Sequence, residues 1–372
     1  MAVPVLDPQV AEVLREQAEA GLIPVEDMPP EEQRANYDKV CKAQFGPVDE
    51  VHSVDDMDAD GVPVRVYRPT DAGEPQRALV FFHGGGFVVG SLDTHDGVTR
   101  ALARRAECIV VAVDYRLAPE HPYPAALDDC WTATKWVIAN AGKLGIDPDR
   151  IGVGGDSVGG NLATIVARKG RDAGTPFAAQ LLIYPTTTCR QDPPSYSMYA
   201  FGYGLTRDQM AWYWRQYIGD FDGSTDPDIS PAALQDLRRM PRSIVITAEA
   251  DVLRDEAESY AQRTFLAGVD TEGYCYDGMI HGFLRMAGVV DRSNQALSEI
   301  AESLKPFLDK TWRDDYSVTL DPKEIMAGIS PQMPEASNRE QRRRQQRLAP
   351  GGGQPPGSKS KSTAPPKRGK RR

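Results

Sequence analysis

The chain has 372 residues, of which 43 are Lys or Arg and 53 are Asp or Glu, for a net charge of −10 at pH 7. Residues 339–372 hold 12 basic groups and one acidic group, a net +11, so residues 1–338 carry −21. With 41 % hydrophobic residues the chain can bury a large core. It has no run of about 18 apolar residues that could span a membrane, and the acidic residues 1–338 would repel nucleic acid.

The cysteines and the N-terminus predict a cytoplasmic protein. The first 19 residues contain no apolar segment like that of a secretory signal. The cysteines form no CxxC pair, which is typical of reduced thiols rather than of a disulfide framework or a zinc site: Cys41, Cys108, Cys130, Cys189 and Cys275. We therefore expect no metal site.

Helices and strands are predicted to alternate along most of the chain. Helical periodicity at 10–18 and 31–44 comes first, and residues 1–45 are expected to pack on the main domain. Apolar, β-branched runs then predict strands at 62–67, 78–82, 108–113, 151–154, 180–184, 243–247 and 272–276. Helices are expected between and after them, at 94–106, 125–139, 161–169, 254–267 and 294–308. This alternation indicates an α/β class with a mostly parallel sheet.

Two stretches interrupt the alternation. Residues 186–238 are rich in Pro, Gly and aromatic residues, and they are interpreted as an aromatic-lined lid, as ordinary helix packing, or as both. Residues 311–372 form a predicted linker and basic tail, and from residue 332 onward there are too few apolar groups to offset the chain entropy. The tail is therefore expected to be disordered.

A glycine-flanked serine follows the predicted strand at 151–154. Residues 155–159 read Gly-Asp-Ser-Val-Gly and fit the G-x-S-x-G pattern of a nucleophile elbow. A sharp strand-to-helix turn would strain the serine backbone and leave room only for glycine on either side. Ser157 is the candidate nucleophile, and a passive serine in a glycine-rich turn is the alternative.

A serine nucleophile needs a base and an acid that orients the base. In one known chain order of such triads both follow the serine, and His281 is the one histidine after Ser157. Asp251 follows the predicted strand at 243–247 and is the first choice of acid. Glu249 is the second choice, and Asp255 falls within the next predicted helix. A helix N-cap is the alternative role of Asp251.

A run of three glycines follows the predicted strand at 78–82. Residues 83–87 read His-Gly-Gly-Gly-Phe, which leaves backbone N–H groups uncovered, as an oxyanion hole requires. We expect Gly84, Gly85, Gly86 and Val158 to form this hole, with the N–H groups of Gly85, Gly86 and Val158 as the donors. A phosphate loop is disfavoured, because the run fits neither G-x-G-x-x-G nor a Walker pattern.

Five segments together resemble the hormone-sensitive-lipase-like (family IV) esterases of the α/β-hydrolase superfamily. They read HGGGF at 83–87, YRLAPE at 115–120, GDSVGG at 155–160, DVLRDE at 251–256 and HGF at 281–283. The resemblance covers about residues 40–310. It implies the α/β-hydrolase fold, with helices on both faces of a mostly parallel sheet, a catalytic domain at 46–310 and a helical cap from residues 1–45 and 186–238.

The resemblance also implies a carboxylic-ester hydrolase with the triad Ser157, Asp251 and His281 and no cofactor. It implies that three further residues support the catalytic residues without contacting the substrate: His83, Tyr115 and Asp156. Two residues depart from the family pattern. Val158 stands where alanine is usual, which would narrow the site or shift its N–H donor, and Val252 replaces a usual proline.

Several questions stay open at this stage. The aromatic cap favours a small-molecule ester with a small or medium acyl group, although the natural ester and the stereoselectivity are not defined. A non-catalytic small-ligand receptor on the same fold is the alternative function. The tail at 339–372 would contact polyanions or an acidic surface, or act only as a solubilising segment or tether. A homodimer is one option for the oligomeric state.

Overall fold

The computed structural model describes residues 4–21 and 28–309. The chain divides into two units, residues 1–326 and 327–372, and every described residue lies in the first. The predicted linker and the basic tail at 339–372 lie outside the described residues. Within the described ranges, no helix is both long and apolar enough to cross a membrane.

An eight-stranded sheet forms the centre of the described unit. Its strands follow the order β1-β2-β4-β3-β5-β6-β7-β8, in which β2 pairs antiparallel with β1 and β4 and all other neighbours are parallel. The chain therefore has the mostly parallel sheet that the alternation predicted. The bounds are β1 (Ser53–Ala59), β2 (Val62–Arg68), β3 (Gln76–Phe82), β4 (Ile109–Val113), β5 (Ile146–Asp156), β6 (Ala179–Ile183), β7 (Arg242–Ala250) and β8 (Thr271–Ile280).

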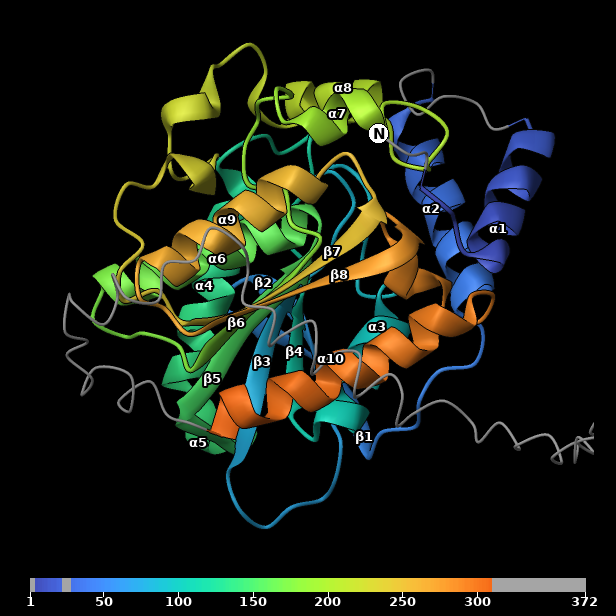
Figure 1. Ribbon diagram of the computed structural model, residues 1–372. Coiled ribbons are helices and arrows are strands. Elements are labelled where there is room, and N and C mark those ends of the chain that lie inside the picture. Colours follow the sequence, from blue (N-terminus) through green and yellow to red (C-terminus); the bar gives the residue numbers. More distant parts are fainter. Residues whose placement is uncertain (1–3, 22–27, 310–372) are drawn as a thin grey trace, which may run out of the picture. The chain divides into compact units, whose positions relative to one another are not determined.

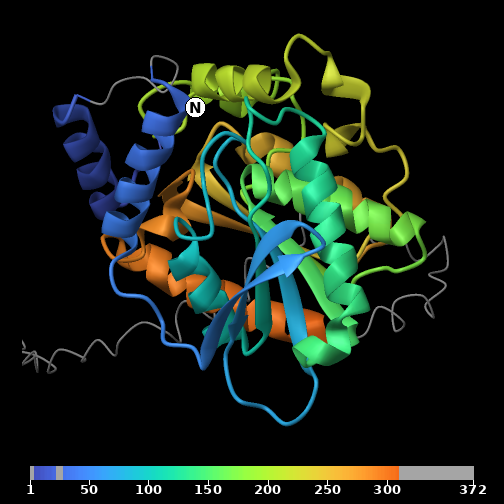
Figure 2. The ribbon, with the colours of Figure 1, turned by 180° about the vertical axis from the view of Figure 1, so that it is seen from behind.

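Helices cover both faces of this sheet. On one face lie α3 (Asp96–Ala106) and α10 (Asp291–Asp309), which pack on each other. On the other lie α4 (Ala125–Ala139), α6 (Val158–Asp172) and α9 (Arg254–Leu266), while α5 (Ala141–Leu144) is a short helix before β5. Helix α10 lies in front of the sheet in Figure 1 and behind it in Figure 2. The fold is the α/β-hydrolase fold.

The first strand was not predicted, because it lacks an apolar alternation. Strand β1 is largely polar and exposed, and a two-residue turn at Asp60 and Gly61, both with positive φ, returns the chain into β2. Arg65 of β2 faces Asp56 of β1, and the two form an ion pair of 2.6 Å. Cross-strand charge pairs and the turn, rather than burial, thus define this edge strand.

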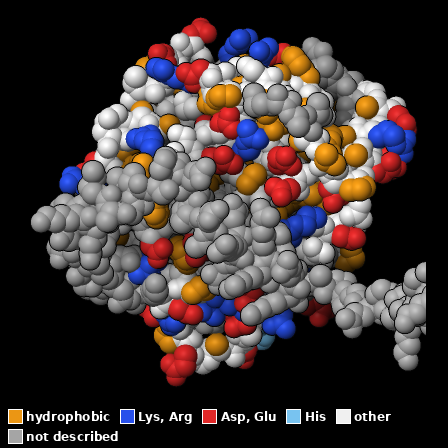
Figure 3. Space-filling view, viewed as in Figure 1, with side chains coloured by type: hydrophobic (Ala, Val, Ile, Leu, Met, Phe, Trp, Pro, Cys, Tyr) orange, Lys and Arg blue, Asp and Glu red, His pale blue; other side chains and the backbone are white. Residues whose placement is uncertain are grey.

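Charged side chains of both signs are interspersed on the face in Figure 3. Ion pairs join many charged side chains of the described residues, such as Arg105 with Asp49 at 2.7 Å and Arg292 with Glu299 at 2.8 Å. No single sign dominates the visible part of the described residues.

Two separate segments lie near the carboxyl ends of the strands. Helices α1 (Pro8–Glu19) and α2 (Pro30–Phe45) come from the N-terminus, and α7 (Pro194–Met198) and α8 (Arg207–Ile218) come from the stretch between β6 and β7. Figure 1 shows α7 and α8 above the ends of β7 and β8 and α1 and α2 beside them. The stretch continues through the short 3-10 helices η2 (Gly223–Thr225) and η3 (Pro231–Ala233) before β7.

The aromatic residues of this stretch divide between packing and exposure. Tyr196, Trp214 and Tyr217 are buried, Tyr213 is half-buried and Phe201 is 62 % exposed. Helix α8 begins at a capping box formed between Thr206 and Gln209, which satisfies N–H groups at its start.

Candidate active site

Ser157 occupies a strained turn between β5 and α6. Its φ of 58° lies in a region that side chains rarely adopt, at a cost on the order of 1–3 kcal/mol. A Cβ on Gly155 would lie 2.4 Å from the Phe82 carbonyl oxygen, and a Cβ on Gly159 would lie 2.0 Å from the same atom. Both positions therefore require glycine, and the turn has the elbow geometry that the G-x-S-x-G pattern predicted.

The structure brings Ser157, His281 and Asp251 together from the ends of three strands. The Ser157 Oγ lies 3.0 Å from His281 Nε2, and His281 Nδ1 lies 2.7 Å from Asp251 Oδ2. Asp251 is 1 % exposed, and its other oxygen accepts the N–H of Leu253 at 2.9 Å. The carboxylate is thereby held in one orientation toward the imidazole.

The two other acids near the end of β7 have different partners. The carboxylate of Glu249 accepts the N–H of Gly278 at 2.7 Å. Asp255 pairs with Arg254 of α9 at 2.8 Å. Helix α9 begins at Arg254 with Leu253 as its N-cap, so Asp251 is not the cap residue. Of the three candidate acids, Asp251 is the one in contact with the imidazole.

The glycine run at 83–87 forms a loop beside Ser157. Gly85 and Gly86 have φ values of 124° and 62°, and among the described residues their N–H groups and that of Val158 meet no acceptor. The Gly84 N–H differs, because it donates to Asp156 Oδ1 at 2.8 Å. Gly84, which was expected in the hole but not among its donors, thus anchors the loop to Asp156 beside Ser157.

Helix α8 closes over this loop. A Cβ on Gly86 would lie 2.2 Å from the Cδ1 atom of Tyr213, so the phenol ring packs directly on the glycine. A glycine with positive φ is required here both by the backbone and by the ring. Helix α8 and the glycine loop are thus in direct contact.

A buried pair stands behind the elbow. His95 Nε2 lies 3.2 Å from Asp156 Oδ1, and His95 Nδ1 lies 2.8 Å from the hydroxyl oxygen of Thr94. Burial opposes ionisation of Asp156, but the interactions with His95, the charge of Arg285 and the Gly84 N–H together outweigh it and lower the pKa of Asp156 to about 2. Asp156 is therefore an anion that holds the glycine loop.

His95 was missed by the sequence reasoning, which considered histidines after the serine. The predicted helix at 94–106 begins instead at Asp96, and the two residues before it make these polar contacts. Adjacent Thr, His and Asp at the start of an apolar helix are the signal that could have identified the site.

His83 and Tyr115 lie against the other side of the loop. Their rings stack at 4.3 Å with an interplanar angle of 14°, and the Tyr115 hydroxyl donates to the His83 carbonyl oxygen at 2.6 Å. Burial, together with the nearby His95, lowers the pKa of His83 to about 3. His83 is consequently neutral near pH 7 and supports the loop by packing.

Metal-ligating side chains are scattered. Within residues 4–21 and 28–309, no three His, Cys, Asp or Glu side chains are grouped so that they could hold a metal ion. All five cysteines are free thiols.

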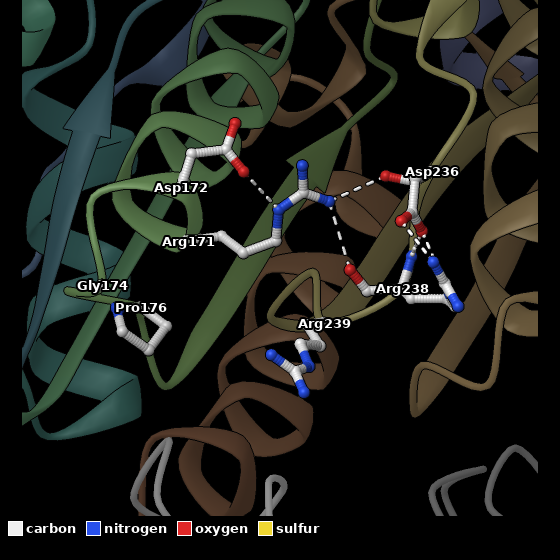
Figure 4. Close-up of a pocket in the computed structure, with 7 residues that line it drawn as sticks. All are labelled: Arg171, Asp172, Gly174, Pro176, Asp236, Arg238 and Arg239. Atoms are coloured by element: carbon white, nitrogen blue, oxygen red, sulfur yellow. Dashed lines mark hydrogen bonds and ion pairs between the residues drawn. The ribbon is translucent and has the colours of Figure 1, made fainter.

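A cavity of about 510 Å³ lies at the far end of α6 from Ser157 (Figure 4). Helix α6 begins beside Ser157 and contributes Arg171 and Asp172 at its other end, which at 1.5 Å per residue is about 20 Å away. Arg171 donates to Asp172 and to the carbonyl oxygen of Asp236, and Arg238 pairs with the Asp236 carboxylate. This cavity is separate from the site around Ser157.

Comparisons with known proteins identify the family of this chain. A family described as the alpha/beta hydrolase fold matches residues 79–285. Carboxylesterase NlhH of Mycobacterium tuberculosis is 43 % identical over 249 residues, 66 % of this chain and 78 % of that protein. The ethyl acetate hydrolase of Pseudomonas putida is 35 % identical over 318 residues, 82 % of this chain and 99 % of that protein.

Solved structures give the same result. The structure of a hyperthermophilic esterase from the archaeon Pyrobaculum calidifontis superposes with a TM-score of 0.77 at 41 % identity and covers 81 % of this chain and 98 % of that one. The chain therefore belongs to the hormone-sensitive-lipase-like esterases of the α/β-hydrolase fold and is a serine ester hydrolase.

Proposed function

We propose that this enzyme hydrolyses small or medium acyl esters through a covalent acyl-serine, with Ser157 as nucleophile, His281 as general base and Asp251 as the orienting acid. The observation that carries the proposal is the continuous chain of contacts from Ser157 Oγ to His281 Nε2 at 3.0 Å and from His281 Nδ1 to Asp251 Oδ2 at 2.7 Å. Both distances suit hydrogen bonds, and the order of atoms suits proton transfer from the serine.

In the acylation step, His281 Nε2 takes the proton of the Ser157 hydroxyl as Oγ attacks the ester carbonyl carbon. The imidazolium that forms is stabilised by the buried Asp251 carboxylate. His281 then gives that proton to the leaving alkoxide, the bond between carbonyl carbon and alcohol oxygen breaks, and the acyl group remains on Ser157. In deacylation, water gives a proton to His281 and attacks the acyl carbon, and Ser157 Oγ leaves with a proton from His281.

The oxyanion formed in each step needs donors that are already in place. The N–H groups of Gly85, Gly86 and Val158 are suited to this role, because no acceptor among the described residues occupies them. Val158 also begins α6, so its N–H lies at the positive end of a helix dipole. Asp156 contributes by holding Gly84, and with it the loop, against the elbow.

The cap supports the choice of acyl size. Partly accessible aromatic side chains from α8 and the preceding loop, Tyr203, Trp212 and Tyr213, lie in the segment that covers the glycine loop. Aromatic surface suits an apolar acyl group. The direct contact between Tyr213 and Gly86 leaves less room for a long chain above the donors.

The test is hydrolysis of para-nitrophenyl esters of increasing acyl length by the wild type and by Ser157→Ala. We expect the variant to lose at least about a thousandfold in kcat and to escape labelling by an organophosphonate. Ser53→Ala, in the exposed β1, is the control and should keep both properties. Residual activity of Ser157→Ala close to that of the wild type would contradict the assignment.

A further inference from the structure

Arg285 is a cation with few partners in the short helix η4 (Phe283–Met286), which follows His281. One terminal nitrogen donates to Cys41 Sγ at 2.9 Å, and the guanidinium carbon lies 4.9 Å from the ring centroid of Tyr37. Its Nε is buried without a hydrogen-bond partner, and among the described residues no carboxylate lies within 4.0 Å of the guanidinium. Arg285 thus has a thiol and an aromatic face, but no anion.

This environment leaves most of the guanidinium unsatisfied. Arginine has five N–H donors, a thiol is a weak acceptor, and a poorly solvated charge without an anionic partner is costly. The charge of Arg285 also acts on Asp156, whose oxygens are already engaged by Gly84 and His95. A ligand with two acceptor oxygens would supply the missing partner.

The guanidinium lies on the histidine side of the site. Gly282 follows His281 directly, and a Cβ on Gly282 would lie 2.5 Å from Arg285 Nη2. The charge of Arg285 also acts on Tyr184, whose ring centroid is 4.7 Å from that of His281. Arg285 is therefore a near neighbour of the candidate base without contacting the triad.

Tyr37 and Arg285 lie side by side and are only half-buried. Both side chains keep partial solvent accessibility. Burial is the largest influence on the pKa of each group. It raises the pKa of Tyr37 well above its usual value. It lowers the pKa of Arg285, but neighbouring groups raise that pKa by more, so Arg285 stays charged. Tyr213, whose ring packs on Gly86, is among the groups that act on the pKa of Tyr37. Tyr37 is thus in contact with Arg285 and also near the residue that covers the glycine loop.

We propose that Arg285 binds a carboxylate carried by the substrate, so that the preferred esters are those bearing a second, ionised carboxyl group. This proposal rests on the proposed esterase function, because Arg285 recognises the substrate and takes no part in the bond changes. A guanidinium binds a carboxylate through two parallel N–H···O bonds, which fixes orientation as well as charge. Tyr37 and Cys41 of α2 hold the guanidinium plane from the cap side.

The experiment compares matched pairs of esters in the wild type, Arg285→Met and Arg285→Lys. In the acyl arm, para-nitrophenyl hydrogen adipate is paired with the para-nitrophenyl ester of an acid of the same length that ends in an isopropyl group. In the alcohol arm, para-acetoxybenzoate is paired with para-isopropylphenyl acetate. The readout is the ratio of kcat/KM for the charged ester to that for its neutral partner, which does not depend on the fraction of enzyme that folds.

We expect this ratio to fall about 10- to 100-fold in Arg285→Met on one arm, with an intermediate value in Arg285→Lys. The arm that responds identifies the half of the ester that lies beside Arg285. Arg292→Met is the matched control, because Arg292 also lies over a tyrosine ring, at 4.7 Å from Tyr276, but is paired with Glu299. Its ratio should stay within about twofold of the wild type.

An equal ratio in the wild type and Arg285→Met on both arms would overturn the proposal. If the neutral esters are hydrolysed while the ratio does not respond, the inference about Arg285 fails and the esterase function stands. If the wild type hydrolyses none of the four esters, the proposed function itself fails, and with it the role of Arg285.

Discussion

Gly86→Ala tests the contact between the cap and the candidate oxyanion hole. The added Cβ would lie 2.2 Å from Tyr213 Cδ1, well inside the roughly 3.5–4.0 Å of ordinary carbon contact, so the loop or the ring must move by more than 1 Å. The backbone at φ 62° adds about 1–2 kcal/mol of strain for alanine. Displacement of one donor N–H costs roughly 3 kcal/mol of transition-state stabilisation, so we expect kcat to fall about 10²- to 10³-fold.

The assay measures kcat and KM for a short-chain nitrophenyl ester together with the thermal unfolding midpoint. Gly202→Ala is the control, because Gly202 also has a positive φ of 87°, but its Cβ would meet nothing within 4 Å. That variant should lose comparable stability and keep kcat within a few fold. Adding Tyr213→Ala to Gly86→Ala should recover part of kcat by removing the clash. If Gly86→Ala alone kept kcat within about threefold, the reasoning would be refuted.

Two further predictions concern buried carboxyl groups. Asp251→Asn should lower kcat about 10³- to 10⁴-fold with little change in KM, because the amide no longer stabilises the His281 imidazolium. Glu249→Gln is the control and should lose far less kcat. Equal losses of kcat in steady-state assays of the two variants would contradict the choice of Asp251 as the acid. Burial raises the pKa of Glu256 to about 8, although its Oε1 accepts a hydrogen bond from the Thr187 N–H. The folded state therefore keeps a proton on this carboxyl group that the unfolded state loses above about pH 4.5. Stability should therefore decrease as pH rises from about 4.5 to about 8, by an amount on the order of a few kcal/mol, and Glu256→Gln should remove this decrease in unfolding midpoints measured at pH 5 and pH 8.

Elements with a strong local pattern were predictable from the sequence. The apolar β4 is buried along its whole length, as its run of β-branched residues indicated, and the glycines around Ser157 were explained by a turn that only glycine fits. Strand β5 is longer than predicted, because its first half, through Asp147 and Arg150, is polar and half-buried. A strand at the centre of a sheet can be recognised from its own run of apolar residues. A strand end or an edge strand is defined by its pairing with a neighbouring strand, which its own residues do not show.

The two residues that the sequence did not identify, His95 and Arg285, have partners in distant parts of the chain. His95 and Asp156 are 61 positions apart, and Cys41 and Arg285 are 244 apart. No spacing rule links such residues, because only the folded sheet brings them together. The candidate triad rests on a different kind of signal, because its chain order and flanking motifs resemble those of a known family.

Helix α2 has a consequence for the order in which the protein is assembled. It precedes the whole sheet in the chain, yet its Arg34 donates to the carbonyl oxygens of Val88 and Ala118, and its Cys41 accepts from Arg285, which follows the last strand. The helix therefore has no complete docking surface until almost the whole catalytic domain has emerged from the ribosome. The contact between Cys41 and Arg285 therefore forms only after the sheet strands that precede Arg285 are available.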